Sequence, residues 1–169
     1  KGRLRSGSKN GLREALAGTR VPAMSISNEP SAMSDALMLS SRSTSAMPQD
    51  VRLTPDGRWF LAADMLRNGV WVIDAHTMEI SRFIPTGHGA HGIYPSRDAR
   101  RIFVSNRDEG SVTVLDAATL TRVALWKIPG GGSPDMGGVS ADGKELWLSG
   151  RYHARVYVFD TTSGKVTHS

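Results

Sequence analysis

The sequence predicts an all-β protein made of four-stranded antiparallel repeats, and two observations predict it. An apolar, strand-like segment that ends in aspartate occurs three times at intervals of about 42–44 residues, ending at Asp74, Asp116 and Asp160. A turn signal precedes each segment in the same register, at Asp56, Asp98 and Asp142. Repeats of this length in one phase indicate a β-propeller fragment of just under three blades, over residues 47–169.

The first repeat shows how each strand is predicted. A strand over residues 49–54 enters the turn at Pro55-Asp56-Gly57, where proline presets φ and glycine takes the left-handed position. Strands over 59–63, 69–74 and 78–84 follow. The second and third are apolar at adjacent positions, which indicates burial on both faces, as in stacked sheets. The blades are therefore expected at about 47–86, 87–130 and 131–169.

Residues 1–46 do not keep the period, and we expect an irregular or disordered leader with a possible short helix over 10–18, capped by Asn10. This leader carries most of the chain's net positive charge. Residues 1–48 hold seven Lys/Arg and three Asp/Glu, whereas residues 49–169 hold fourteen and thirteen. The blades are nearly neutral, so the charge does not favour a strong phosphate-binding face.

Several classes of site and segment are excluded by simple patterns. The chain has no cysteine, so it has neither disulfides nor thiolate metal sites. No apolar run is long enough to cross a bilayer. Residues 87–92 match the dinucleotide pattern G-x-G-x-x-G, but Pro95 forbids the helix that this pattern needs. These glycines are instead expected to link two blades.

Candidate site residues lie at equivalent repeat positions. Gln49, His91 and Asp135 each begin the innermost strand of a blade, so we expect them around one mouth of the central channel, with His88 beside them. Arg107 and Arg151 follow the second strands and could bind an anion there, or pair with local acids such as Asp108. The alternative is a solvated rim around water. His88 and His91 have no third metal ligand nearby in sequence, although Asp135 could supply one, so neither a metal site nor a catalytic residue is predicted.

The motifs resemble those of a known family. Phe103-Val104-Ser105-Asn106, followed by a strand ending in aspartate, resembles the Tyr-Val-Thr-Asn repeats of bacterial seven-bladed propellers of the YVTN type (surface-layer or YncE-like). Segments 47–50, 87–92 and 130–138 are similar to the C-terminal half of actinobacterial members. The resemblance implies an extracytoplasmic location and seven blades, so we expect this chain to be a piece of a larger ring.

Three functions follow from the resemblance. The favoured one is a non-catalytic binding or scaffold module without a cofactor, whose partners are the remaining blades or a second copy, and a small ligand or protein. The second is a lactonase-like or cofactor-binding propeller, such as the haem-binding propeller of a respiratory nitrite reductase, in which His88 or His91 would be a ligand or an acid/base. The third is nucleic-acid binding, known for a periplasmic relative.

Overall fold

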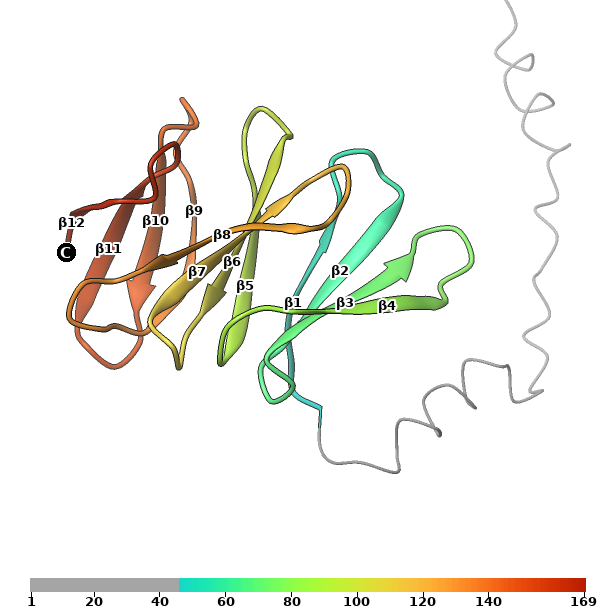
Figure 1. Ribbon diagram of the computed structural model, residues 1–169, viewed down its shortest axis with the longest axis horizontal. Helices are drawn as coiled ribbons and strands as arrows, with labels where there is room; N and C mark the ends of the chain where they lie inside the picture. The colour runs from blue at the N-terminus through green and yellow to red at the C-terminus, as the bar shows by residue number, and fades with distance from the viewer. Residues whose placement is uncertain (1–45) are drawn as a thin grey trace, which may run out of the picture. The chain divides into compact units, whose positions relative to one another are not determined.

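The computed structural model describes residues 46–169, and these residues form only strands and turns. Twelve strands make three four-stranded antiparallel sheets in chain order (Figure 1). The first blade contains β1 (Pro48–Leu53), β2 (Trp59–Asp64), β3 (Gly69–Asp74) and β4 (Ile80–Pro85); the second contains β5 (Ala90–Pro95), β6 (Arg101–Asn106), β7 (Ser111–Asp116) and β8 (Arg122–Lys127); the third contains β9 (Pro134–Val139), β10 (Glu145–Gly150), β11 (Arg155–Asp160) and β12 (Val166–His168). The predicted partial β-propeller is confirmed.

The strand order identifies the inner edge of each blade. Strands pair in sequence within every sheet, as β1-β2-β3-β4 and its two equivalents. The first strands also contact one another in series, β1 with β5 and β5 with β9, whereas the outer strands β4, β8 and β12 have no comparable contacts between blades. The first strands are therefore innermost, as predicted.

The turn after each third strand is held by the aspartate that the repeat predicted. The Asp74 carboxylate accepts hydrogen bonds from the backbone N–H groups of His76 and Thr77, at 2.8 and 2.9 Å. Asp116 and Asp160 accept the equivalent pairs. In the first blade, most strand boundaries lie within one residue of the prediction, and the largest difference is that β4 begins at Ile80 rather than at residue 78. Met78 belongs to the turn, because its N–H donates to the Asp74 carbonyl and its φ is 61°.

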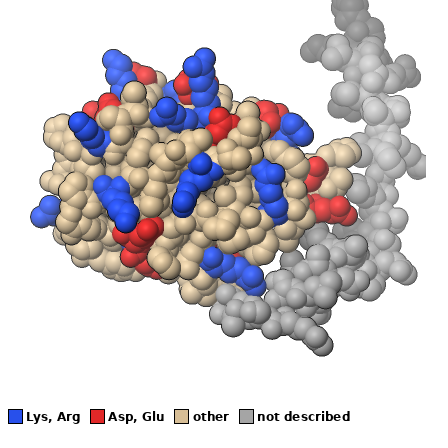
Figure 2. Space-filling model, viewed as in Figure 1, with Lys and Arg blue, Asp and Glu red and all other residues tan. Residues whose placement is uncertain are grey.

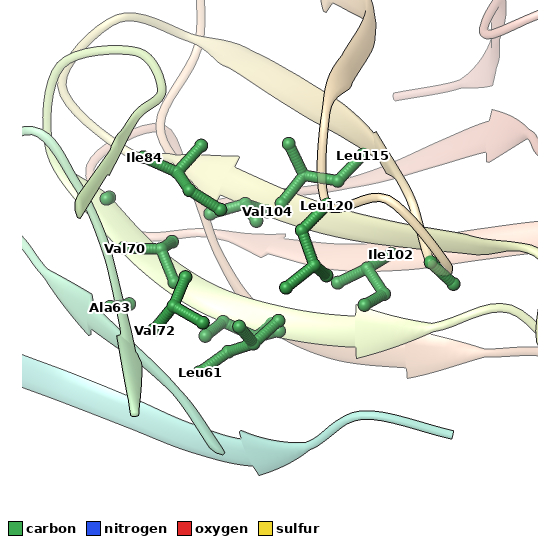
Figure 3. Packing of buried hydrophobic residues seen from close by; sticks show 12 residues of the cluster. Leu61, Ala63, Val70, Val72, Ile84, Ile102, Val104, Leu115 and Leu120 are labelled. Carbon is green, nitrogen blue, oxygen red and sulfur yellow. The ribbon is translucent and has the colours of Figure 1, made fainter. Parts of the chain in front are cut away.

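The core lies between the blades rather than inside any one of them. Between the first two blades, apolar side chains from both sheets meet in one cluster (Figure 3), which includes Leu61, Val70, Val72, Ile102, Val104 and Leu115. A second cluster joins the second and third blades, and includes Phe103, Val112, Trp126, Leu146, Tyr157 and Phe159. Burial on both faces of the middle blade explains why its strands lack the apolar–polar alternation of a half-exposed sheet.

The two outermost faces carry apolar side chains that no other blade in residues 46–169 covers. In the third blade, Trp147 and Val156 are each 48% exposed. Their repeat equivalents in the second blade, Phe103 and Val112, are fully buried. In the first blade, Val51 is 51% exposed, whereas its equivalent Ile93 is fully buried. Both end faces therefore have the composition of an interface between blades.

Two predictions concern other parts of the chain. Apart from Ala46, the predicted leader over 1–46 and its helix over 10–18 lie outside the described residues. Within residues 46–169 there is no helix that could span a membrane.

Candidate functional site

The candidate site is centred on Asp135, the second residue of β9. Its side chain is only 4% exposed, and three groups reach its carboxylate. The Nδ1 atom of His91 lies 2.9 Å from Oδ1, Arg107 Nη1 lies 3.6 Å from Oδ1, and Arg151 Nη1 lies 3.6 Å from Oδ2. The structure thus brings together four of the six residues that the sequence indicated, from two neighbouring blades.

The repeat explains why these side chains meet. His91 and Asp135 occupy the same position in two inner strands, one residue after the strand begins. Arg107 and Arg151 each follow the last residue of a second strand, β6 or β10, at the same end of the blade. Since β6 is antiparallel to β5, its C-terminal end lies beside the start of β5, and the same holds for β10 and β9.

The charge at the site depends on the protonation state of His91. Burial of the His91 ring lowers its pKa, Asp135 opposes this effect, and the two arginines lower the pKa further. The imidazole is therefore neutral near pH 7, and the Asp135 carboxylate faces two guanidinium groups. Hydrogen bonding is also incomplete: within residues 46–169, His91 Nδ1, Arg107 Nε and Asp135 Oδ1 are buried atoms without a well-aligned hydrogen-bond partner. Buried polar atoms of this kind are uncommon in folded proteins.

A second layer of hydrogen bonds fixes the backbone of Asp135. Its carbonyl oxygen accepts from the Tyr94 hydroxyl at 3.0 Å and from Ser105 Oγ at 2.9 Å. The Ser105 hydroxyl also accepts from the N–H of Gly92. Burial, with a smaller contribution from Asp50, raises the pKa of Tyr94 to about 12, so this phenol remains a donor. A Cβ atom at Gly92 would overlap the Tyr94 hydroxyl, so a larger residue here would displace this phenol from the Asp135 carbonyl.

Arg107 connects the loops of three blades. It is 7% exposed, its Nη2 contacts the sulfur of Met65 in the first blade, and its guanidinium lies 5.8 Å from the ring centre of Tyr152 in the third. Asp108 is 3.9 Å from its Nε. Sequence reasoning missed Met65 and Tyr152 as neighbours of this arginine. The repeat register could have indicated these contacts, because both residues lie in the loop after the second strand of a blade, as Arg107 does.

Asp50 is a further buried acid near the site that sequence reasoning did not select. It is 8% exposed, and its Oδ2 accepts a hydrogen bond of 2.9 Å from the N–H of Ile93 in the next blade. Its Oδ1 lies 3.1 Å from Arg52. The sequence did offer a signal for Asp50, because the equivalent repeat positions hold the uncharged residues Gly92 and Met136.

The structure does not bring Gln49 and His88 to this cluster. Gln49 is exposed, and its side-chain amide donates to the carbonyls of Met47 and Pro48 in its own segment. His88 is also exposed. Its backbone carbonyl, rather than its side chain, accepts hydrogen bonds from the N–H groups of Asp108 and Glu109 in the loop after β6. Among residues 46–169, no three His, Cys, Asp or Glu side chains are grouped to hold a metal ion.

A comparison with protein families decides the identity of the fold. The model of the YNCE-like β-propeller matches residues 19–169, which is most of the chain. The chain belongs to this family. No curated protein matches it significantly. The seven-blade ring, the surface-layer type and the actinobacterial source remain predictions.

Solved structures of low sequence identity share the fold of this YNCE-like propeller. Hydrazine synthase from Kuenenia stuttgartiensis aligns with a TM-score of 0.64 at 20% identity, over 72% of this chain and 34% of that one. The periplasmic gluconolactonase PpgL from Pseudomonas aeruginosa aligns at 0.60 and 20%, over 72% and 39%. The β-propeller domain of Cps50 (Swd1) from Myceliophteria thermophila aligns at 0.60 and 18%, over 73% and 43%. This chain therefore spans less than half of each.

Proposed function

We propose that this chain is the ligand-binding part of a non-catalytic YNCE-like propeller that acts outside the cytoplasm. The observation that carries the proposal is the Asp135 cluster, where two arginines and a neutral histidine surround one buried carboxylate. Arg151 is exposed, so its guanidinium is accessible to a ligand. A carboxylate-bearing small molecule fits these groups, because a guanidinium can bind a carboxylate through two hydrogen bonds.

Succinate is a suitable first probe, with binding followed by NMR of the labelled histidine and arginine side chains. We expect signals of His91 and Arg151 to shift, and His91→Ala and Arg151→Gln each to weaken binding about fivefold or more. Lys127→Gln is the charge-matched control, because Lys127 is exposed at the end of the outer strand β8. Normal succinate binding by both site variants would contradict the proposal.

An enzyme is the second candidate, and one geometric observation favours it. A neutral imidazole with its Nδ1 atom 2.9 Å from a buried carboxylate resembles the histidine–carboxylate pair of general bases, although the two atoms are not aligned as a hydrogen bond here. PpgL is named as a gluconolactonase, so the matching test is hydrolysis of gluconolactone by the chain. A rate that disappears in His91→Ala, with a pH profile governed by one basic group, would favour the enzyme over the binding module.

The remaining proposals concern partners and location. We infer that further blades, from the same polypeptide or a second copy, cover the end faces. Trp147 and Val51 are exposed there, whereas the residues at the equivalent repeat positions are buried between blades. Export is supported by the family resemblance and by the periplasmic neighbour PpgL, and fractionation of cells that make the protein would test it. Nucleic-acid binding has less support, because acidic and basic side chains are interspersed on the face drawn in Figure 2.

A further inference from the structure

A cavity lies between the second and third blades, at the ends of the strands opposite the Asp135 cluster. Its volume is about 500 Å³, within the range of small-molecule sites. The walls are the turn from β5 to β6, the turn from β9 to β10, and the start of the turn after β11. Because β5 and β9 begin at the channel mouth and end at these turns, the cavity is separate from the candidate site described above.

One repeat position distinguishes this junction from the junction between the first two blades. Trp59 begins β2, and its ring packs against the apolar core between the first and second blades. The equivalent residue at the start of β6 is Arg101, whose Nη1 donates to the Thr161 carbonyl of the third blade at 3.0 Å. An aromatic side chain is thus replaced by a partly buried cation that lines the cavity.

The lining has more positive than negative charge. Four basic residues stand against two acidic ones: Arg97, Arg100, Arg101 and Lys144 against Asp98 and Asp142. Each of the two aspartates is already used by its own turn. The Asp98 carboxylate accepts from the Ser96 hydroxyl and the Arg100 N–H, and Asp142 accepts the equivalent pair. Asp142 also lies 3.8 Å from Lys144 Nζ. Two acids cannot neutralise four bases, so the lining keeps a net positive charge.

Two of the arginines are held in place before any ligand binds. Arg97 donates through Nε to the Ser140 carbonyl at 3.0 Å and through Nη2 to the Val139 carbonyl at 2.6 Å, so it connects the two blades. Arg101 is fixed by Thr161. By contrast, the Arg100 side chain makes no hydrogen bond or ion pair with residues 46–169 and is exposed. Fixed donors lower the ordering cost of binding, and a free one can close on the ligand.

We propose that this cavity binds a small molecule with two or more anionic groups, in which Arg101 and Arg100 are the main contacts. Guanidinium groups bind phosphate and carboxylate oxygens through paired hydrogen bonds, and both chemistries fit the same cavity. Inorganic pyrophosphate and citrate represent the two sources. The site is independent of the ligand proposed for the channel mouth.

The test is calorimetric titration of the whole chain with each probe. Arg101→Trp copies the first blade and fills the cavity, and Arg101→Gln removes the charge while leaving the space. We expect both variants to weaken binding about tenfold or more. Arg122→Gln is the control, because Arg122 is exposed on the outer strand β8 and loses the same charge.

Binding of pyrophosphate alone would identify a phosphate ligand, and binding of citrate alone would identify a carboxylate ligand. Either result supports the site when the binding is weakened in both Arg101 variants. Three results would overturn it: no binding of either probe at millimolar concentration, equal binding by both Arg101 variants and the wild type, or an equal loss in Arg122→Gln. The last result would mean that binding depends on the net charge of the protein rather than on the residues of the cavity. Circular dichroism of each variant separates lost binding from lost folding.

Discussion

Six aspartates show how single residues shape the blades. Three close the third strands, at Asp74 and its equivalents, and three lie in the turns before the second strands, at Asp56 and its equivalents. Hydrogen bonds from the following backbone N–H groups lower the pKa of Asp74, most strongly that from Thr77. In Asp56, the Thr54 hydroxyl is the largest cause of the lowered pKa, followed by the N–H of Arg58. These turns are therefore held by the charged form of the side chain.

The first prediction is that acid loosens these turns. Since the folded-state pKa lies below the unfolded value of about 3.9, the stabilisation is complete above about pH 5 and is lost as the pH falls through the folded-state pKa. Asp116→Asn should reduce the dependence of the thermal midpoint on pH between about 5 and 3. Glu79→Gln is the control, because the Glu79 carboxylate makes no hydrogen bond or ion pair within residues 46–169. An unchanged slope in Asp116→Asn would contradict the prediction.

The second prediction concerns backbone strain at Ala99. Its φ is 59°, whereas the equivalent positions hold Gly57 and Gly143, with φ of 73° and 78°. Only glycine takes this conformation without steric cost. Ala99→Gly should raise the free energy of unfolding by about 1 kcal/mol, and Gly57→Ala should lower it by a similar amount. Urea denaturation measures both. Destabilisation by Ala99→Gly would show that the alanine side chain contributes more than the strain costs.

At the scale of elements, the same strand position is buried or exposed according to its blade. Val112 in β7 is fully buried against the third blade, and its equivalent Val156 in β11 is 48% exposed. The third prediction is that Val112→Ala lowers the free energy of unfolding by about 2 kcal/mol, through lost burial and a small cavity. Val156→Ala should cost less than about 0.5 kcal/mol. Equal losses would mean that Val156 is covered in solution.

The strands were predictable because their sequence signals are local and repeated. Departures from the repeat were not predictable, because they depend on contacts beyond the local sequence. Asp74 and its equivalents mark turns by themselves, whereas the late start of β4 depends on the backbone conformation of Met78. At the site, the repeat register was enough to bring His91 and Asp135 together. The bond from Ile93 to Asp50 joins two blades and has no local signal. The exposed position of Gln49 could not be predicted either, because it depends on what lies beside β1.

At the scale of the whole molecule, both end faces should make the chain associate. Val51 and Trp147 expose apolar surface on opposite ends of the three-blade stack, and such surfaces favour self-association. The fourth prediction is that sedimentation velocity shows concentration-dependent association, and that Val51→Glu together with Trp147→Glu reduces it. Val123→Glu is a control, because Val123 is 57% exposed on the outer strand β8 rather than on an end face. A stable monomer at high concentration would contradict the prediction.

The fifth prediction separates the leader from the blades. Residues 1–48 carry four of the chain's five net positive charges. If the chain binds DNA, deletion of these residues should greatly reduce the dependence of the binding constant on salt, because fewer counterions are released. Fluorescence anisotropy at several salt concentrations measures this slope. An unchanged slope would place the DNA contacts on the blades and would favour the nucleic-acid-binding function.

The exposure of Trp147 has an optical consequence. Its indole is 48% exposed and donates to Glu145, whereas Trp126 in the second blade is buried against Phe103 and Phe159. An indole in contact with water emits at longer wavelength than one in an apolar environment. Docking of a further blade on this end face should therefore shift the emission of Trp147 to the blue, and Trp147→Phe should abolish the shift. The docking of such a blade can therefore be followed by intrinsic fluorescence without any added label.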